Sequence, residues 1–413
     1  MKQIATFPRK IQLLFDVVFE KFSKDPRRLL INLHDRGGVR LNNIFPCVDD
    51  DGYLIKSGVD PVTRSANIQL ILIRDGIVLK TWQPDWENIS AQAKVKIGRQ
   101  IDINSAVAVH PLPLPNGDLF FNVQDVAVVI DSKSKSTVLD FVSHHSVELG
   151  NGGLCVITPS VYTGFFKSNT FLNSRLRDDS ILTATIGGKI IDNLSFSMIL
   201  SNNGLDYLMF GHSGLDLITQ DPLHINQISV AHSDGAFWKK GDYLISARHL
   251  SAIFIFRPSE NRIVWYQVGP WKNQHCVHFV DSVRIALLDN NVFGHDSNAP
   301  IEQNFVDASD INRVFVVDFS SGKPVITEPF KSVLELDGLR PRTVTEGRIR
   351  VMTNDSLFFE DTNNGRQFMI KRGRLVWYRL NQYNGDYIGR LSWGRYLTKE
   401  EGEKLLDVVG FQK

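Results

Sequence analysis

Hydrophobic and polar residues alternate in short runs along most of the chain beyond residue 35. The runs are rich in Val, Ile, Phe and Tyr, and Asn-Gly, Asp-Gly or Gly-Asp pairs separate them. Alternation with period two places one set of side chains on each face of a strand, and these pairs favour tight hairpin turns. The pattern therefore predicts a protein built almost entirely of antiparallel strands.

The strands recur as a unit that has a polar first residue, several strands joined by turns, and often a tryptophan near its end. Six such units can be traced, at residues 66–82, 109–131, from 144, 224–267, 274–326 and 344–380. Repeats of several strands each are typical of a radial array of small sheets. The predicted fold class is all-β, a six-bladed β-propeller with short N- and C-terminal helical segments.

Both ends of the chain interrupt the strand pattern. Residues 1–40 are expected to form a helical or extended segment, because apolar residues recur there at helical spacing: Ile11, Leu14, Phe15, Val18 and Phe22. Residues 41–395 are expected to form the propeller, and residues 396–413 a C-terminal helix. Thr398 and Glu401 have the spacing of a capping box at the start of that helix.

Composition narrows the class of protein further. The 413 residues include 43% hydrophobic and 22% charged residues, which is ordinary for a soluble globular chain. The formal net charge of +1 gives no reason to expect nucleic acid as a partner. No apolar run is long enough to span a membrane, and no signal peptide is visible. The three cysteines have no metal-binding spacing, and no phosphate-cradling glycine loop predicts a nucleotide cofactor.

Four histidines stand at the start of a repeat. Three of them precede the next turn of their unit by six residues, at Asn116, Asn151 and Asp281. The innermost strands of a propeller line its central channel, so equivalent first residues of successive blades converge at one rim. We therefore expect these four side chains to lie near one channel mouth: His110, His145, His224 and His275.

Polar residues around two of these histidines suit an anionic group. His224 and Asn226 are two residues apart, hence on one strand face, and Arg248 follows in the next strand. Arginine offers a permanent charge and a donor fork that matches tetrahedral oxyanions. A neutral His275 could then act as a nucleophile toward the bound group. A catalytic metal and a purely structural role for the histidines remain alternatives, and we expect no metal because few carboxylates or thiolates accompany these positions.

The segment from His224 to Asn291 resembles the bacterial arylsulfate sulfotransferase family. It contains "HIN", "GDYLISARHLSAIFIF", "NRIVWYQVG", "QH" and "LLDNN", and the earlier segments "HPLPLPNGDL" and "HH" followed by an Asn-Gly turn extend the resemblance. Members of that family are six-bladed propellers that move a sulfuryl group from a phenolic sulfate ester to a phenol. They use no nucleotide donor, and the group passes through a covalent sulfohistidine.

The resemblance implies roles for individual residues. His275 falls on the family's nucleophile, while His224, Asn226 and Arg248 fall on residues that contact the sulfate oxygens. A histidine such as His224 or His145 is expected to exchange protons with the aryl oxygens. The chain departs from the family where Cys276 follows the nucleophile.

Further substrate-binding positions follow from the same alignment. The early histidine pair falls on His144 and His145, and turn spacing favours His145 as the side chain that faces the channel. His110 is expected nearby, and Gln274 is expected to set the turn before His275.

The implied partners are small molecules, an aryl sulfate donor and a phenolic acceptor. No cofactor is expected, a homodimer is compatible with the sequence, and the compartment is open, although family members are usually periplasmic. Two other functions stay open: a non-catalytic propeller that serves as a binding platform, and a sulfatase-like or phosphatase-like hydrolase that uses the same anion site. Dependence of turnover on an acceptor separates the hydrolase from the transferase.

Overall fold

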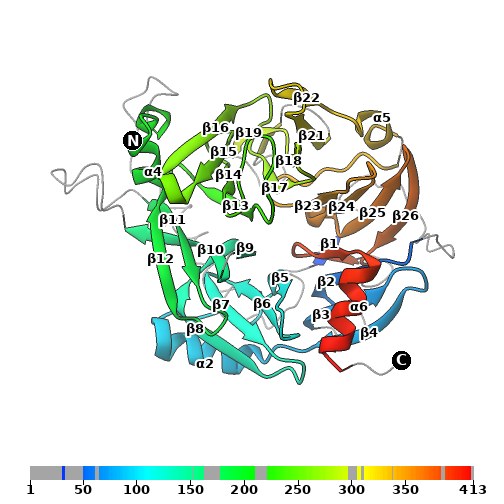
Figure 1. Ribbon diagram of the computed structural model, residues 1–413. Helices are drawn as coiled ribbons and strands as arrows, with labels where there is room; N and C mark the ends of the chain where they lie inside the picture. The colour runs from blue at the N-terminus through cyan, green and yellow to red at the C-terminus, as the bar shows by residue number, and fades with distance from the viewer. Residues whose placement is uncertain are drawn as a thin grey trace, which may run out of the picture.

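The computed structural model describes residues 30–32, 50–60, 65–150, 152–161, 177–209, 221–295, 305–307, 311–336, 338–382 and 387–410. Within these residues, six four-stranded antiparallel sheets stand around a central axis (Figure 1). The predicted six-bladed propeller is therefore confirmed. The residues expected to form an N-terminal helix, the Asn151 turn residue and Cys47 lie outside the described residues.

We number the blades in chain order and give their strands from the innermost outward. Blade 1 contains β28 (Arg395–Leu397), β2 (Tyr53–Val59), β3 (Ala66–Leu72) and β4 (Ile77–Trp82). Blade 2 contains β5 (Val109–Pro113), β6 (Leu119–Val123), β7 (Val126–Ile130) and β8 (Ser136–Val142). Blade 3 contains β9 (His144–Gly150), β10 (Gly153–Val161), β11 (Arg177–Ala184) and β12 (Ile190–Ser195).

The other three blades follow the same order. Blade 4 contains β13 (Ile225–Val230), β14 (Tyr243–Ala247), β15 (Ala252–Arg257) and β16 (Arg262–Val268). Blade 5 contains β17 (His275–Phe279), β18 (Arg284–Asp289), β21 (Arg313–Asp318) and β22 (Val325–Thr327). Blade 6 contains β23 (Arg348–Val351), β24 (Leu357–Asp361), β25 (Arg366–Lys371) and β26 (Arg374–Leu380).

Two strand pairs lie outside the blades. The first joins β1 (Leu30–Asn32) to β27 (Tyr387–Gly389), and the second joins β19 (Val292–His295) to β20 (Phe305–Asp307).

The hydrophobic core lies between neighbouring blades. The middle strands are buried on both faces; all six residues of β15 and all five of β6 and β24 are buried. One apolar cluster joins Ile253 and Ile255 of blade 4 to Ile285 and Leu287 of blade 5. Outermost strands such as β4 and β16 are largely exposed. Each blade therefore depends on both neighbours to cover its apolar faces.

The ring is closed by strands from opposite ends of the chain. β28 pairs antiparallel with β2, and Tyr53 stands opposite Leu397 while Ile55 stands opposite Arg395. The C-terminal end of the chain thus supplies the innermost strand of a blade whose other strands come from the N-terminal end. This pairing covers the inner edge of β2.

Helices decorate the ring. The C-terminal helix α6 (Lys399–Val408) has the predicted capping box, in which the Thr398 hydroxyl accepts from the Glu401 backbone amide. Three other α-helices, α2 (Trp86–Ile97), α4 (Phe196–Asn202) and α5 (Lys331–Leu334), were not predicted. Among the described helices, none is long and apolar enough to cross a membrane.

Helix α2 covers the outer edge of blade 2 (Figure 1). Gln92 donates to the Ser136 carbonyl at 3.1 Å and accepts from the Val138 amide at 3.0 Å, both on β8. Two local sequence signals mark the ends of helix α2: an N-cap at Asp85 and a left-handed glycine, Gly98, at the C-terminal end. The prediction missed them because the surrounding strand pattern dominated the interpretation.

Ring closure can be tested by truncation. A chain that ends at residue 394 loses β28 and α6. Strand β2 then lacks its inner partner, and the chain that follows blade 6 no longer pairs with blade 1. We expect loss of cooperative thermal unfolding and of the near-ultraviolet circular dichroism signal. A chain that ends at residue 410 is the control and should unfold as the full chain does. A cooperatively folded monomer that ends at residue 394 would contradict this role of β28.

Candidate active site

The inner strands begin with a common backbone irregularity near the channel. A β-bulge follows Val109 in β5 and His275 in β17, and similar shifts occur in β9 and β13. Three of the four expected histidines have left-handed backbone, with φ of 57° at His110 and His145 and 48° at His224. Bulges re-aim side chains, and left-handed backbone in residues other than glycine is a strain found at functional sites.

His275 differs from the other three by one position. In β17 the left-handed residue is Cys276, with φ of 49°, and its side chain is buried against blade 6, where the thiol contacts the Ile349 backbone. Turn spacing alone had placed His275 at the position of His110 and His145. The four histidines are therefore not strictly equivalent, although His145, His224 and His275 do approach one another in space.

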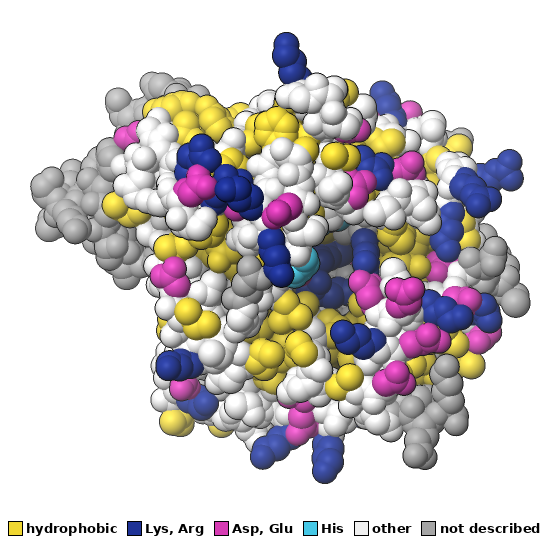
Figure 2. All heavy atoms as spheres, viewed as in Figure 1, with side chains coloured by type: hydrophobic (Ala, Val, Ile, Leu, Met, Phe, Trp, Pro, Cys, Tyr) yellow, Lys and Arg dark blue, Asp and Glu magenta, His cyan; other side chains and the backbone are white. Residues whose placement is uncertain are grey.

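The surface view shows a hollow at the centre of the ring, with histidine and Lys or Arg side chains visible in it (Figure 2). His275 is 1% exposed. Its Nδ1 lies 2.5 Å from Asn290 Oδ1, and the Asn290 amide nitrogen donates to the carbonyls of Thr343 at 2.8 Å and Glu346 at 2.7 Å. Because those two carbonyls fix the amide orientation, His275 Nδ1–H must be the donor to Asn290.

The other nitrogen of His275 is left with its lone pair. Nε2 is buried and has no hydrogen-bond partner among the described residues. Burial, and then the charge of Arg248, hold the pKa of His275 well below its usual range, so the ring is neutral at neutral pH. This combination is that of a nucleophile with a fixed tautomer.

His145 lies near His224 and Trp393. Its ring packs at 5.0 Å from that of His224, edge to face. His144 turns the other way into blade 3, where its Nε2 lies 3.1 Å from the buried Asp179 carboxylate. The two neighbouring rings are linked by an Nδ1–Nδ1 contact of 2.6 Å. Burial, followed by the charges of neighbouring histidines, lowers the pKa of His145 well below the usual value.

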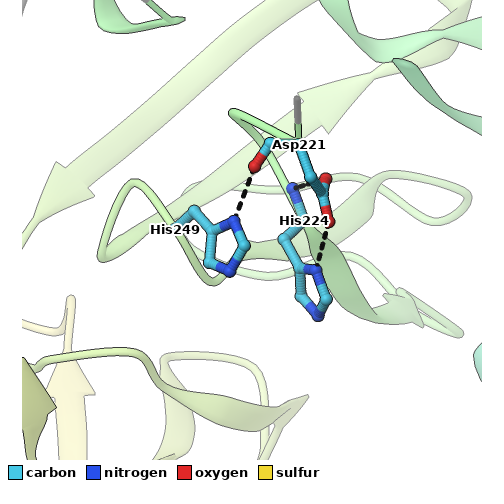
Figure 3. Close-up of side chains that lie close together, drawn as sticks. All are labelled: Asp221, His224 and His249. Atoms are coloured by element: carbon cyan, nitrogen blue, oxygen red, sulfur yellow. Dashed lines mark hydrogen bonds and ion pairs between the residues drawn. The ribbon is translucent and has the colours of Figure 1, made fainter. Parts of the chain in front are cut away.

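His224 is held by a carboxylate that the sequence reasoning missed. Asp221 Oδ2 lies 2.6 Å from His224 Nδ1, and its Oδ1 accepts from the His224 backbone amide at 3.2 Å (Figure 3). Burial opposes ionisation of Asp221, but the bond from His224 and nearby positive charge hold its pKa at about 2. An Asp three residues before a histidine could have been noticed, because both sit at the start of the strand.

Arg248 follows β14 directly, and its backbone amide donates to the His224 carbonyl at 3.0 Å. Burial lowers its pKa to about 10, against the opposing effect of Asp221, so the guanidinium stays charged. Arg248 Nε is buried and finds no hydrogen-bond partner in the part of the chain that the structure describes. A desolvated donor near a neutral imidazole suits a bound oxyanion.

The side chains of Asn226 and Gln274 make hydrogen bonds to other groups of the protein. Asn226 Nδ2 donates to the Gln274 carbonyl at 2.7 Å, and the amide oxygen is buried without a hydrogen-bond partner among the described residues. Gln274 Nε2 donates to Ser246 Oγ and to the Ala252 carbonyl, both at 2.9 Å. Both residues therefore position the start of β17. An amide oxygen cannot donate to a sulfate, so this geometry differs from the substrate contacts expected for them.

His110 contacts charged side chains. It is fully buried, and its Nδ1 accepts from the Val147 amide at 3.0 Å. Its Nε2 contacts Arg348, and Arg395 at 3.1 Å, which together surround the Glu148 carboxylate. His110 thus belongs to a charged network with Arg348, Arg395 and Glu148.

Trp393 is a central residue that no motif had identified. Its ring lies 5.6 Å from that of His110, 5.9 Å from that of His145 and 5.8 Å from that of His275. The side chain is 2% exposed, and the backbone is left-handed with φ of 55°. Trp393 immediately precedes the segment that enters β28, so closing the ring places this indole among histidines from three blades.

Among the described residues, one group could hold a metal ion: Asp221, His224 and His249. Their ligand atoms all lie within 4.8 Å of one another. His275 is not part of this group.

Comparison with known proteins gives a family and distant structural likenesses. The family model of arylsulfotransferase (ASST) matches residues 115–381. No curated protein sequence matches the chain significantly.

Solved structures that resemble the chain do so weakly. A protein of unknown function from Bacteroides caccae has a TM-score of 0.47 and 10% identity, over 84% of this chain and 99% of that one. A streptogramin B lyase has a TM-score of 0.41 and 12% identity, over 89% and 96%. Virginiamycin B lyase from Staphylococcus aureus has 0.40 and 11%, over 89% and 98%. At these TM-scores the likenesses carry no argument about function.

The neutral buried histidines predict acid sensitivity of the fold. The unfolded chain takes up protons below pH 6.5, whereas His110 and His275 remain neutral in the folded state, so stability falls as pH drops below 6.5. Each of these two buried rings should cost up to about 2 kcal/mol between pH 6.5 and 5. Glu360, whose pKa burial raises to about 7, acts in the opposite direction. Urea unfolding at pH 7.5 and pH 5 measures the balance, and equal stability at both would contradict it.

Proposed function

Because the chain belongs to the arylsulfotransferase (ASST) family, we propose that it moves a sulfuryl group from an aryl sulfate ester to a phenolic acceptor through a sulfohistidine on His275. The observation that carries the proposal is the state of His275. The ring is neutral, and Asn290 Oδ1 accepts a hydrogen bond from its Nδ1–H. The Nε2 lone pair has no partner among the described residues. Most buried polar side-chain atoms in proteins have a hydrogen-bond partner, so an open Nε2 on a buried ring suits an atom that reacts.

Charge stabilisation in the proposed reaction falls to Arg248. Its buried Nε–H and its persistent charge would bind an equatorial oxygen of the sulfuryl group while that group lies between donor and acceptor atoms. The electrostatic influence of Arg248 on His275 supports their closeness. Asn226 and Gln274 contribute by holding the β17 backbone on which His275 stands.

Proton exchange is assigned to His224. With Nδ1–H donated to Asp221, its Nε2 is the nitrogen that exchanges a proton with an aryl oxygen. Asp221 fixes the ring orientation and stabilises the imidazolium, as a carboxylate does in hydrolytic triads. His145 packs edge to face against His224 and would lie beside the bound substrate.

The proposed steps balance in atoms and charge. His275 Nε2 attacks sulfur, the sulfur–oxygen bond to the donor breaks, and protonated His224 gives its proton to the departing aryloxide. The acceptor phenol then loses its proton to His224 and attacks the sulfur, and the sulfur–nitrogen bond breaks to restore neutral His275. Over one cycle, a sulfuryl group and a proton have changed places between two phenols.

The His275 role is tested by substitution and mass measurement. His275→Asn keeps polarity and approximate size but removes the nucleophile, so it should fold and transfer no sulfuryl group. Wild-type protein given an aryl sulfate without acceptor should release a burst of phenol near one equivalent. It should also gain a sulfuryl mass on the peptide that contains His275, and added phenol should remove that mass.

His278→Asn, three residues along the same strand, is the matched control and should keep the label. Steady turnover by His275→Asn, or a label on another residue, would refute the proposal. Sustained phenol release that needs no acceptor would instead indicate a hydrolase that uses water.

Arg248 should matter mainly in the transition state. Arg248→Leu removes a charge-assisted donor from a developing oxyanion, a loss typically worth about 3 to 4 kcal/mol, or roughly a hundredfold or more in kcat/KM. Arg262→Leu, on the exposed strand β16, is the control for removing a positive charge and should leave kcat/KM unchanged. If Arg248→Leu folds and keeps full turnover, the guanidinium has only a structural role.

A further inference from the structure

A single residue, Asp221, orients two imidazole rings at the channel mouth. Its carboxylate lies 2.6 Å from His224 Nδ1, and its backbone carbonyl lies 2.6 Å from His249 Nδ1. The two rings are nearly parallel, with centroids 4.4 Å apart and an interplanar angle of 28°. Figure 3 shows both rings directed away from Asp221 on the same side.

This arrangement determines which nitrogens are available. A carbonyl or carboxylate oxygen can only accept, so each Nδ1 must carry the proton. The lone pairs of the neutral rings are therefore on the two Nε2 atoms, side by side. Histidines that bind metal ions almost always donate their other N–H to a carboxylate or a backbone carbonyl in this way.

The local charge does not exclude a cation. The nearby Arg177 guanidinium is paired with the buried Asp179 carboxylate at 3.1 Å. The ionised Asp221 interacts with the charge of Arg248. The two positive groups are thus matched by two carboxylates, and the mouth has no unbalanced positive charge from these four residues.

We propose that a divalent transition-metal ion of the zinc, copper or nickel class binds across His224 Nε2 and His249 Nε2, with Asp221 as the residue that orients both ligands. Imidazole nitrogen suits these metals, whereas magnesium and calcium prefer oxygen. Asp221, His224 and His249 each offer a possible ligand atom within 4.8 Å of the other two, and zinc–nitrogen bonds are about 2.0–2.1 Å. His249 is exposed, which leaves its ring room to turn toward a bound ion.

The consequence of binding is inhibition, a point that rests on the proposed function. A metal ion on His224 Nε2 occupies the lone pair that the proposed reaction uses for proton exchange. The ion therefore acts as a reversible lock on the site, and the metal-free protein is the active form.

Calorimetric titration of the tag-free chain with zinc chloride in a non-chelating buffer tests binding without any turnover. We expect one site per chain, a dissociation constant at least tenfold higher for His249→Gln, and no binding of magnesium. His232→Gln removes another exposed histidine and should leave the affinity unchanged. Cobalt(II) provides a second measurement, because nitrogen ligation gives visible absorption bands that His249→Gln should lose.

Equal zinc affinity of wild type and His249→Gln, or equal binding of magnesium, would overturn the site. If His249→Gln failed to fold, absence of cobalt bands in the wild type would overturn it instead. Inhibition is measured separately: zinc should suppress aryl sulfate turnover, a chelator should restore it, and His249→Gln should resist zinc.

The two proposals fail in distinguishable ways. A wild-type chain without any aryl sulfate turnover refutes the transferase, while calorimetry still decides the metal site. A transferase that zinc binds but does not inhibit refutes the lock alone. Activity that a chelator abolishes and zinc restores would show a metal cofactor and would overturn both the lock and the metal-free reaction.

Discussion

Burial of both faces of every blade is the constraint on which the rest of the structure depends. The middle strands carry apolar side chains on each side, so a blade without two neighbours would expose them to water. Only a closed ring provides two neighbours for all six blades, and β28 completes it by pairing with β2. Closure has a second effect, because the same segment carries Trp393 and Arg395 into the centre. Trp393 then meets histidines of three blades, and Arg395 donates to the Val147 carbonyl of blade 3 at 2.9 Å.

Within the closed ring, hydrogen-bond acceptors decide the chemical state of the histidines. Burial makes the charged form of His275 unfavourable, and the amide oxygen of Asn290 determines where its remaining proton resides. Asp221 does the same for His224 and His249. The histidines therefore differ in chemical state. His275 has a buried lone pair without a partner, whereas His110 is hydrogen-bonded within the network of Glu148, Arg348 and Arg395. The cost is a fold that should weaken in acid, since these neutral rings resist protonation.

Much of the architecture could be predicted from repeats. Alternation, hairpin turns and the period of the units predict the six blades, and local spacing predicts the capping box of α6. Helix α2 was missed although Asp85 and Gly98 mark its ends, because strand patterns surround it. Turn counting put His275 in register with His110 and His145, but β5 and β17 share the same bulge, and the left-handed position in β17 belongs to Cys276. The hairpins close where the Leu114 amide donates to the Asp118 carbonyl and the Val280 amide to the Arg284 carbonyl, four residues after His110 but five after His275. The Asp281-Ser282 pair was therefore counted as the turn one residue too early.

The sequence by itself determined the blade number, the family and the set of polar residues that gather near the axis, because these depend on periodicity and on local motifs. Tertiary structure alone decided what each of those residues can do. Asn290 follows β18 directly and contacts His275, and Trp393, near the C-terminal end of the chain, packs against the same ring. Whether Asn226 presents a donor or an acceptor depends on the Gln274 carbonyl, 48 residues away. Tautomers, desolvation and unpaired atoms arise from contacts between blades, and no spacing along the chain encodes them.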